Sequence, residues 1–278
     1  MSSPYATFQT PPPETTNFKL TFPAPFVLLI TINREKAMNS ITVAGHWEGD
    51  SIFTWFDEEP ELRVAIVTGA GTRSFSAGAD LKEVNKTRGK GTAPVPMPTG
   101  SFMGFTRRLG KKPVIGAVNG YAYGGGFEIA LNCDMVIASP TAKFSLPETS
   151  RGLYAGAGGL ARAVRIFGMQ LASEIALAGR ILTAQELERF GFCRVSKTQE
   201  SLVDEAVAMA KAVGLQSPDA LIVTRSGLRQ AWETGSLERA SQITEERYGK
   251  ALMEGENMKI GTAAFARKEQ PKWVPSKL

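Results

Sequence analysis

The stretch of sequence that says most about the fold is Asn119-Gly120-Tyr121-Ala122-Tyr123-Gly124-Gly125-Gly126-Phe127-Glu128. A short apolar run at residues 114–118 precedes it and predicts a buried strand. The apolar residues that follow the glycines, as far as Leu131, predict a helix. Small residues directly after a strand allow backbone N–H groups to approach a ligand closely. The stretch therefore predicts a strand, a tight turn with accessible amides, and a helix.

Strands and helices alternate on both sides of this stretch. Further apolar runs predict strands at 26–32, 62–69 and 135–138. A helical stretch lies between the first two of these runs and ends near Pro60. Strands that alternate with helices indicate an α/β fold. Thr183 and Glu186 match a capping box and predict the start of another helix.

The chain divides into four parts. Residues 1–25 are rich in proline and hydroxyl residues and predict an N-terminal tail that ends in an edge segment, whereas residues 26–195 predict a sheet-containing core. Residues 196–275 predict a helical C-terminal region. A monomer could not bury all the apolar faces of these helices, so we expect subunit contacts there. The fourth part is the tripeptide 276–278.

Composition excludes several classes of protein. His46 is the only histidine, which excludes histidine-rich zinc sites, and its apolar surroundings favour a structural role. Cys133 and Cys193 share no metal-ligand spacing, so we expect no metal. The net charge of +5 is spread along the chain, which argues against nucleic-acid binding but suits an anionic ligand. No apolar run reaches the roughly 20 residues that span a membrane, and we expect neither a membrane span nor a secretory signal.

Other segments also combine small residues with possible ligand contacts. Ser76-Ala77-Gly78-Ala79-Asp80-Leu81-Lys82 is a second small-residue turn after a predicted strand. Glu148 follows the apolar stretch 144–147, and Gly156-Ala157-Gly158-Gly159 opens another predicted helix. Gly69-Ala70-Gly71 supplies only two glycines of the dinucleotide fingerprint and lacks its acidic partner. We therefore expect no nicotinamide cofactor.

Taken together, these motifs closely resemble the enoyl-CoA hydratase/isomerase (crotonase) superfamily. The resemblance runs from about Leu28 to Lys268, with the motifs in the family's order and spacing. It is carried by Asn33-Arg34, Lys36-Ala37-Met38-Asn39, the segment 76–82, Lys112-Pro113-Val114-Ile115, Ala117-Val118-Asn119-Gly120, Gly124-Gly125-Gly126-Phe127-Glu128, Cys133-Asp134, 144–148 and 156–159.

The resemblance implies an architecture and a ligand. The fold would be a ββα spiral core, and the helical C-terminal region would form a homotrimer or a hexamer. The ligand would be an acyl-CoA, with no cofactor besides the coenzyme A that the substrate carries. Its thioester oxygen would lie in an oxyanion hole made by the N–H groups of Ala79 and Gly125. The CoA-binding residues would be Lys36, Ala37, Ala77, Ala79, Asp80, Leu81 and Lys82, with Lys268 as a weaker candidate for a phosphate contact.

Glu128 and Glu148 match the two catalytic glutamates of the family's hydratases. One would activate water for attack at C3 of a trans-2-enoyl-CoA, and the other would deliver a proton to C2. Two carboxyls in an apolar pocket are expected to push each other's pKa values apart. Three alternatives stay open on this scaffold: a Δ3,Δ2-enoyl-CoA isomerase, a related isomerase or lyase, and a non-catalytic binding protein.

Three departures leave the acyl group unspecified. Ala155 stands where many relatives have proline, Phe127 is bulkier than usual, and the segment 92–98 matches no family pattern. It lies within 89–100, where three prolines and three glycines predict a mobile loop.

The sequence ends in Ser276-Lys277-Leu278, the peroxisomal import tripeptide. It predicts binding to the import receptor and a fungal-type, peroxisomal member of the superfamily that acts in β-oxidation.

Overall fold

The computed structural model describes residues 6–88 and 96–278. Its larger sheet has six strands in the order β1-β2-β3-β5-β7-β10. The edge pair β1 and β2 is antiparallel, and all later pairs are parallel. The strands are β1 (Phe18–Ala24), β2 (Val27–Ile32), β3 (Val64–Gly69), β5 (Val114–Val118), β7 (Met135–Ala138) and β10 (Arg194–Val195).

A smaller sheet follows the order β4-β6-β8-β9. Its strands are β4 (Ser74–Ser76), β6 (Tyr121–Tyr123), β8 (Lys143–Ser145) and β9 (Leu182–Thr183). Each of β3, β5 and β7 in the larger sheet is followed by a strand of the smaller sheet and then by a helical segment. This repetition is the expected ββα arrangement, and the α/β class is confirmed.

The helical segments that follow the paired strands place the site. They include α2 (Leu81–Arg88), α3 (Gly125–Asn132) and the 3-10 turn η3 (Glu148–Arg151). The remaining segments of the core are η1 (Glu35–Ala37), α1 (Val43–Glu58), η2 (Phe102–Gly104), α4 (Gly159–Leu177) and α5 (Ala184–Arg189). The capping box before α5 is confirmed, because Glu186 N–H donates to Thr183 Oγ1 at 3.2 Å and Thr183 N–H donates to Glu186 Oε2 at 2.8 Å.

The structure corrects the prediction for the N-terminus. The edge segment expected at the end of the tail is a regular strand, β1, which occupies residues 18–24 and points Phe18, Leu20, Phe22 and Ala24 inward. Pro23 is compatible with this strand because β1 lies at the edge of the sheet and pairs only with β2. The prediction for 89–100 falls largely on residues 89–95, outside the described residues.

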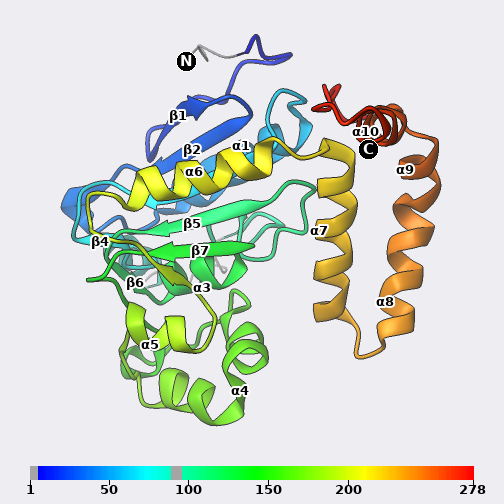
Figure 1. Cartoon of the computed structure of the whole chain (residues 1–278). Helices are drawn as coiled ribbons and strands as arrows, with labels where there is room; N and C mark the ends of the chain where they lie inside the picture. The colour runs from blue at the N-terminus through cyan, green and yellow to red at the C-terminus, as the bar shows by residue number, and fades with distance from the viewer. Residues whose placement is uncertain (1–5, 89–95) are drawn as a thin grey trace.

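The helical C-terminal region begins with α6 (Leu202–Gly214), which crosses one face of the larger sheet (Figure 1). Ala206 and Ala210 are fully buried there, and their small side chains let the helix lie close to β3 and β5. The helices α7 (Pro218–Glu233) and α8 (Leu237–Thr244) then form a pair at one side of the molecule (Figure 1). The π-helix Glu245–Gly249, α9 (Lys250–Glu254) and α10 (Glu256–Arg267) complete the chain.

A partly buried ion-pair cluster ties α7 to the core. Asp134, in the turn between α3 and β7, accepts hydrogen bonds from Arg225 Nε at 3.0 Å and Arg229 Nη2 at 2.7 Å. Burial alone would raise the pKa of Asp134, but the two guanidinium groups outweigh it and hold the pKa below its usual value. Among the described residues no single helix is long and apolar enough to cross a membrane, and the only pair that would suffice together, α6 and α7, is bent by 108°.

Candidate active site

A cavity of about 760 Å³ opens where the N-terminal end of α3 meets η1, the turn before α2, and η3. Both glutamates and both candidate oxyanion residues line it. The apolar part of the lining includes Met38, Met97, Phe102 and Leu153. The ββα repetition explains this convergence, because each ββα unit delivers a turn or helix start to the same edge.

The two candidate oxyanion amides are free, and backbone geometry explains why. Ala79 is paired with Ile41 in an isolated β-bridge, but the hydrogen bonds of this bridge come from the residues on either side of Ala79. Ile41 N–H donates to the Gly78 carbonyl at 2.8 Å, and Asp80 N–H donates to the Ile41 carbonyl at 3.0 Å. Gly125 is the first residue of α3, so its N–H has no partner within the helix. Neither amide donates a hydrogen bond to any described residue. Both therefore remain available to a ligand oxygen, and the dipole of α3 adds to the Gly125 contact.

Close packing holds the two amides side by side. Gly78 has φ +88°, and a β-carbon there would lie 3.1 Å from the Gly125 nitrogen, so only glycine allows this approach. On the other side, a β-carbon on Gly125 would lie 2.5 Å from the Phe102 ring. His46 packs edge-on against Phe102 at 4.7 Å between ring centroids, and its Nδ1 accepts from Met103 N–H at 3.0 Å. Burial lowers the pKa of His46 to about 4, so it is neutral and supports η2.

Removing the Gly125 donor should slow the reaction. Gly125→Pro would eliminate the N–H but also collide with Phe102, so the substitution is best made in a Phe102→Ala background. We expect the double variant to be about 10²- to 10³-fold slower than Phe102→Ala alone, because one oxyanion donor is lost. Steady-state kinetics with a CoA thioester measure the difference, and equal rates in the two folded variants would reduce Gly125 to a turn residue.

Glu128 lies in the first turn of α3 and is only 3% exposed. Its Oε1 accepts a hydrogen bond from Gly159 N–H, the first residue of α4, at 2.8 Å. Burial raises the pKa of Glu128 to about 7, although the amides of Gly159 and Ala157 and the charge of Arg162 act in the opposite direction. A carboxyl with this pKa can take up and release a proton near neutral pH.

Glu148 begins η3 and faces the turn before α3. Its Oε1 would lie 3.0 Å from a β-carbon on Gly124, which brings the carboxylate directly against the glycine turn. Its Oε2 is buried and has no hydrogen-bond partner among the described residues. Burial raises the pKa of Glu148 as well, and Arg151 opposes the rise. A carboxyl with a raised pKa and an unpartnered oxygen can exchange a proton with a ligand in the cavity.

The sequence predicts that the two carboxyls push each other's pKa values apart. In the structure, repulsion between them is not the main cause of the shifts. Burial is the largest cause of the raised pKa of Glu128, and the charge of Glu148 contributes less. Both pKa values lie above the ordinary value of a glutamate, and that of Glu128 rises to about 7. The apolar surroundings, more than mutual repulsion, therefore favour the protonated form of each glutamate.

Most of the candidate CoA-binding residues surround the cavity. Its wall includes Lys36, Ala37, Ala77, Ala79, Asp80, Leu81 and Lys82. Lys268 is not part of this wall; it caps the C-terminal end of α10, and its phosphate contact stays a prediction. The carboxylate of Asp80 is already engaged, because it pairs with Arg34 Nη2 at 2.9 Å and accepts from Lys82 N–H at 3.2 Å.

Several cavity residues escaped sequence reasoning. Tyr123 lines the cavity beside Gly124, and the alternation of Tyr121, Ala122 and Tyr123 in β6 could have indicated that its ring shares a face with Tyr121. Met97 comes from the segment that matched no pattern and reaches the wall. Phe127, by contrast, is fully buried against Phe144 and outside the cavity wall, so its bulk does not reshape the site.

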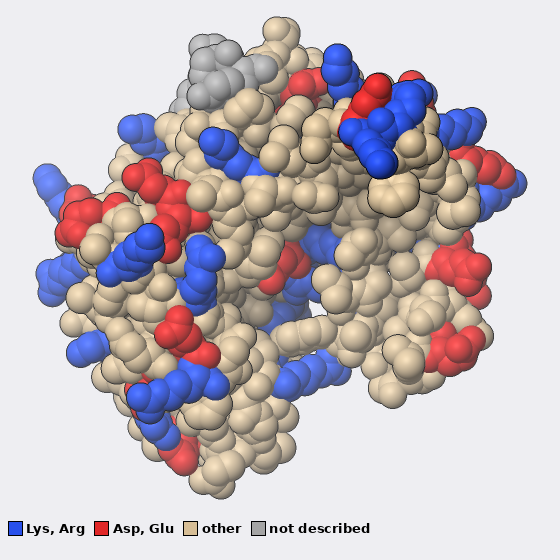
Figure 2. Space-filling model, in the orientation of Figure 1, with Lys and Arg blue, Asp and Glu red and all other residues tan. Residues whose placement is uncertain are grey.

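Charges on the surface are mixed, and no metal site is present in the described part. Figure 2 shows lysine and arginine interspersed with aspartate and glutamate over the face in view. Within residues 6–88 and 96–278, no group of three or more His, Cys, Asp or Glu side chains could hold a metal ion.

Comparisons with known proteins agree with this geometry. Residues 25–275 match the family model of the enoyl-CoA hydratases/isomerases. The chain is 46% identical over 259 residues to a mevalonyl-coenzyme A hydratase of Aspergillus fumigatus, covering 93% of this chain and 95% of that protein. It is 36% identical over 251 residues to a carnitinyl-CoA dehydratase of Escherichia coli, covering 89% and 94%.

Solved structures show the same fold. An enoyl-CoA hydratase from Mycobacterium marinum superposes with a TM-score of 0.83 at 33% identity, covering 94% of this chain and 99% of that one. One from Bacillus anthracis gives 0.81 at 30% identity, covering 93% and 99%. The chain belongs to the enoyl-CoA hydratase/isomerase family, that is, to the crotonase superfamily.

Proposed function

We propose that the protein is a CoA-thioester hydratase that interconverts a 2-enoyl-CoA and its 3-hydroxyacyl-CoA. One observation carries this proposal. The carboxyls of Glu128 and Glu148 line one cavity with two free backbone amides, those of Ala79 and Gly125. A thioester oxygen on the amides places C2 and C3 of its acyl chain beside the carboxyls.

The reaction follows from these positions. In hydration, Glu128 takes a proton from water as the water oxygen bonds to C3, and the electrons of the double bond move toward the thioester oxygen. The Ala79 and Gly125 N–H groups stabilise the negative charge that develops there. Glu148 then delivers its proton to C2. In dehydration the same groups act in reverse: Glu148 removes the C2 proton, and Glu128 protonates the departing hydroxyl.

For the acyl group we propose a mevalonyl-type thioester, which has a hydroxyl and a methyl at C3 and a second hydroxyl at C5. The support is the 46% identity to a mevalonyl-coenzyme A hydratase over nearly the whole chain, against 36% to a carnitinyl-CoA dehydratase. Tyr123 and Tyr154 add hydroxyl groups to a mainly apolar cavity, which suits an acyl chain with a polar end. A straight-chain enoyl-CoA of β-oxidation is the alternative substrate.

The experiment that tests this proposal is a comparison of substrates. Purified protein is assayed for dehydration of mevalonyl-CoA and carnitinyl-CoA and for hydration of crotonyl-CoA. We expect the largest kcat/KM with mevalonyl-CoA, by about tenfold or more, the range that pocket contacts of this kind supply. A preference for crotonyl-CoA would assign the protein to straight-chain hydration instead, and no activity with any of the three would contradict a hydratase.

For assembly we propose a homotrimer or a dimer of trimers, built through the helical C-terminal region. Large apolar side chains stand exposed on these helices: Leu228 is 68% exposed, Leu237 86% and Phe265 88%. We infer that these side chains contact neighbouring subunits, because contiguous exposed apolar surface marks protein–protein contacts. We predict three or six subunits in solution by light scattering, and a stable monomer at micromolar concentration would contradict this.

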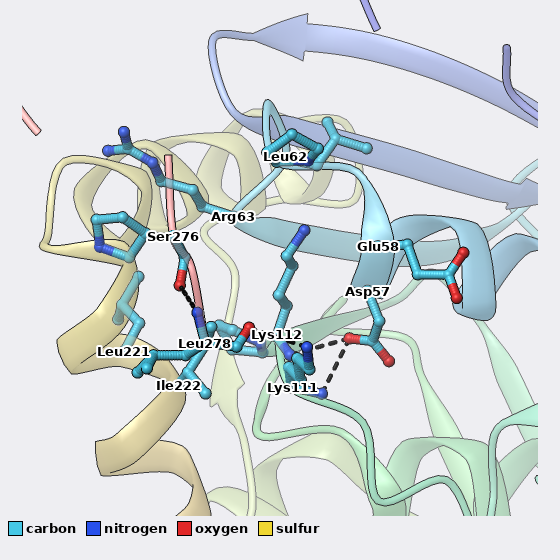
Figure 3. Close-up of a pocket in the computed structure, with 13 residues that line it drawn as sticks. Asp57, Glu58, Leu62, Arg63, Lys111, Lys112, Leu221, Ile222, Ser276 and Leu278 are labelled. Carbon is cyan, nitrogen blue, oxygen red and sulfur yellow. Dashed lines mark hydrogen bonds between the residues drawn. The ribbon is translucent and has the colours of Figure 1, made fainter. Parts of the chain in front are cut away.

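For localisation we propose the peroxisome, on the strength of residues 276–278. Ser276 and Leu278 line a second cavity of about 220 Å³ (Figure 3). Neither Glu128 nor Glu148 is part of its lining. Lys111 Nζ donates to the Leu278 carbonyl at 2.9 Å, Leu278 N–H donates to Ser276 Oγ at 3.1 Å, and Ser276 Oγ pairs with Asp219. A receptor that reads the tripeptide must first displace these contacts.

A localisation experiment tests this proposal. A fluorescent protein fused before residue 1 should give a punctate signal in fungal cells, because the tripeptide remains available at the other end. Deletion of 276–278 should make the signal cytosolic. Substitution of the exposed Lys272, which lies outside the tripeptide, serves as the control and should leave the signal punctate. Punctate signal after the deletion would show that another segment directs import.

A further inference from the structure

A partly buried cation near Glu128 has no part in the reaction described above. Arg162 lies in the first turn of α4, and its Nη1 is inaccessible to solvent. The Arg162 side chain makes no hydrogen bond or ion pair with any described residue. A charged nitrogen that is buried without a partner costs free energy, so its surroundings need an explanation.

Two neighbouring glycines show what Arg162 faces. Gly158 has φ +108°, and a β-carbon there would lie 2.6 Å from Arg162 Nη1, so the guanidinium folds back over the start of its own helix. A β-carbon on Gly159, the next residue, would lie 2.7 Å from Glu128 Cγ. The guanidinium and the Glu128 side chain therefore pack on consecutive glycines at the N-terminal end of α4.

Among the charged groups around Arg162, Glu128 exerts the strongest attraction. From η3, Glu148 acts on Glu128 as a like charge. Arg107 approaches Arg162 from the loop after η2, but its Nη2 donates to the Gly156 carbonyl at 2.6 Å. Arg229 of α7 is paired with Asp134, and Glu233 of α7 exerts a weaker attraction on Arg162 than Glu128 does.

We propose that Arg162 is a positioning residue for Glu128: its guanidinium supplies the opposite charge that stabilises the Glu128 carboxylate each time this group loses its proton. Gly159 N–H already holds Oε1 from the helix end, and Arg162 adds a full charge from the same side. The proposal rests on the proposed function, in which Glu128 exchanges a proton with water or with the departing hydroxyl. Arg162 itself lies outside the cavity wall and acts only through Glu128.

The expected pH dependence has a definite sign. The pair of glutamates is active with one proton, and loss of that proton as the pH rises past about 7 gives the alkaline limb of kcat/KM. Without Arg162 the Glu128 carboxylate is less stable, so the pair keeps its proton to higher pH. The alkaline limb of kcat/KM therefore moves to higher pH. Glu128 also becomes a weaker acid toward the departing hydroxyl, so the plateau rate falls.

The test uses the whole chain and five variants. Arg162→Met removes the charge, Arg162→Gln removes it but keeps a polar head group in case the first variant does not fold, and Arg162→Lys retains it. Arg165→Met is the matched control, because Arg165 lies one turn further along α4 and is exposed. For each protein, kcat/KM is measured against pH, and Glu128 is titrated directly by carbon-13 NMR of labelled glutamate side chains, assigned with Glu128→Gln.

We expect the neutral variants to lose about tenfold in plateau kcat/KM and to shift both the alkaline limb and the NMR titration upward by about one pH unit. Arg162→Lys should keep most of the wild-type plateau kcat/KM and titrate close to the wild-type pH. Arg165→Met should change neither the plateau kcat/KM nor the titration. A rate loss with no shift in either titration would make Arg162 a structural residue and overturn the proposal. Wild-type protein without hydratase activity would refute the proposed function alone, because the NMR titration still decides the role of Arg162.

Discussion

Glu148→Gln will leave the protein folded and will reduce turnover by about 10⁴-fold, at the upper end of the range for loss of a catalytic acid or base. The glutamine amide cannot deliver a proton to C2 or remove one from it, so hydration and dehydration both lose this step. Any Δ3,Δ2-isomerisation by the same protein will be lost too, since a 3-enoyl-CoA must lose a proton from C2 before C4 receives one.

The structure makes Glu148→Gln a clean substitution. Oε2 of Glu148 has no hydrogen-bond partner among the described residues, so the amide breaks no existing contact. Burial already raises the pKa of this carboxyl, which means that a neutral side chain is tolerated at least as well. Thermal unfolding should therefore stay close to that of the wild type.

A matched control separates catalysis from a general effect of charge. Glu58→Gln makes the same chemical change at an exposed position at the end of α1, away from the cavity. This variant should keep wild-type kcat and KM. Turnover by Glu148→Gln within tenfold of the wild type would remove Glu148 from the mechanism, and an equal loss in Glu58→Gln would point to damage of the fold.

The turns that build the site could be predicted because their signals are local. Small residues follow a strand directly in two places, the glycine run before Phe127 and the segment around Gly78. The first supplies the free amide of Gly125 and the second that of Ala79. Glu128 could be recognised as unusual from its apolar neighbours alone. It is buried in the structure.

The surroundings of the site could not be predicted in the same way, because they depend on contacts between distant residues. His46 accepts from Met103, 57 positions further along the chain, and together with Phe102 supports Gly125. Arg162 packs over the start of α4, where Gly159 N–H donates to Glu128, 31 positions earlier in the chain. Such contacts form only when separate ββα units pack together.

Strand β1, which is predicted from the sequence only as an edge segment after a tail, has a different explanation. Phe18, Leu20, Phe22 and Ala24 alternate with more exposed residues, a period that is visible in the sequence. The prolines around this segment favoured a tail, yet Pro23 is acceptable in an edge strand whose partner lies on one side only. The alternation was the stronger signal.

Glu128→Gln will distinguish a hydratase from an isomerase. Hydration needs Glu128 to take a proton from water, so we expect this variant to hydrate about 10²- to 10⁴-fold more slowly. Isomerisation moves a proton between C4 and C2, which one well-placed base can do, and Glu148 would suffice. Any isomerase side activity should therefore survive in Glu128→Gln and be lost in Glu148→Gln.

The Glu128 substitution should also preserve the local structure. Glu128 Oε1 accepts from Gly159 N–H, and a glutamine Oε1 can accept the same hydrogen bond, so the start of α4 keeps its contact. The measurement is hydration of a 2-enoyl-CoA and isomerisation of a 3-enoyl-CoA by the wild type and both variants. If the wild type isomerises rapidly, hydrates barely, and is unaffected by Glu128→Gln, the water-activating role of Glu128 is wrong. The free amides and Glu148 would then serve proton transfer between carbon atoms, and the protein would be an isomerase.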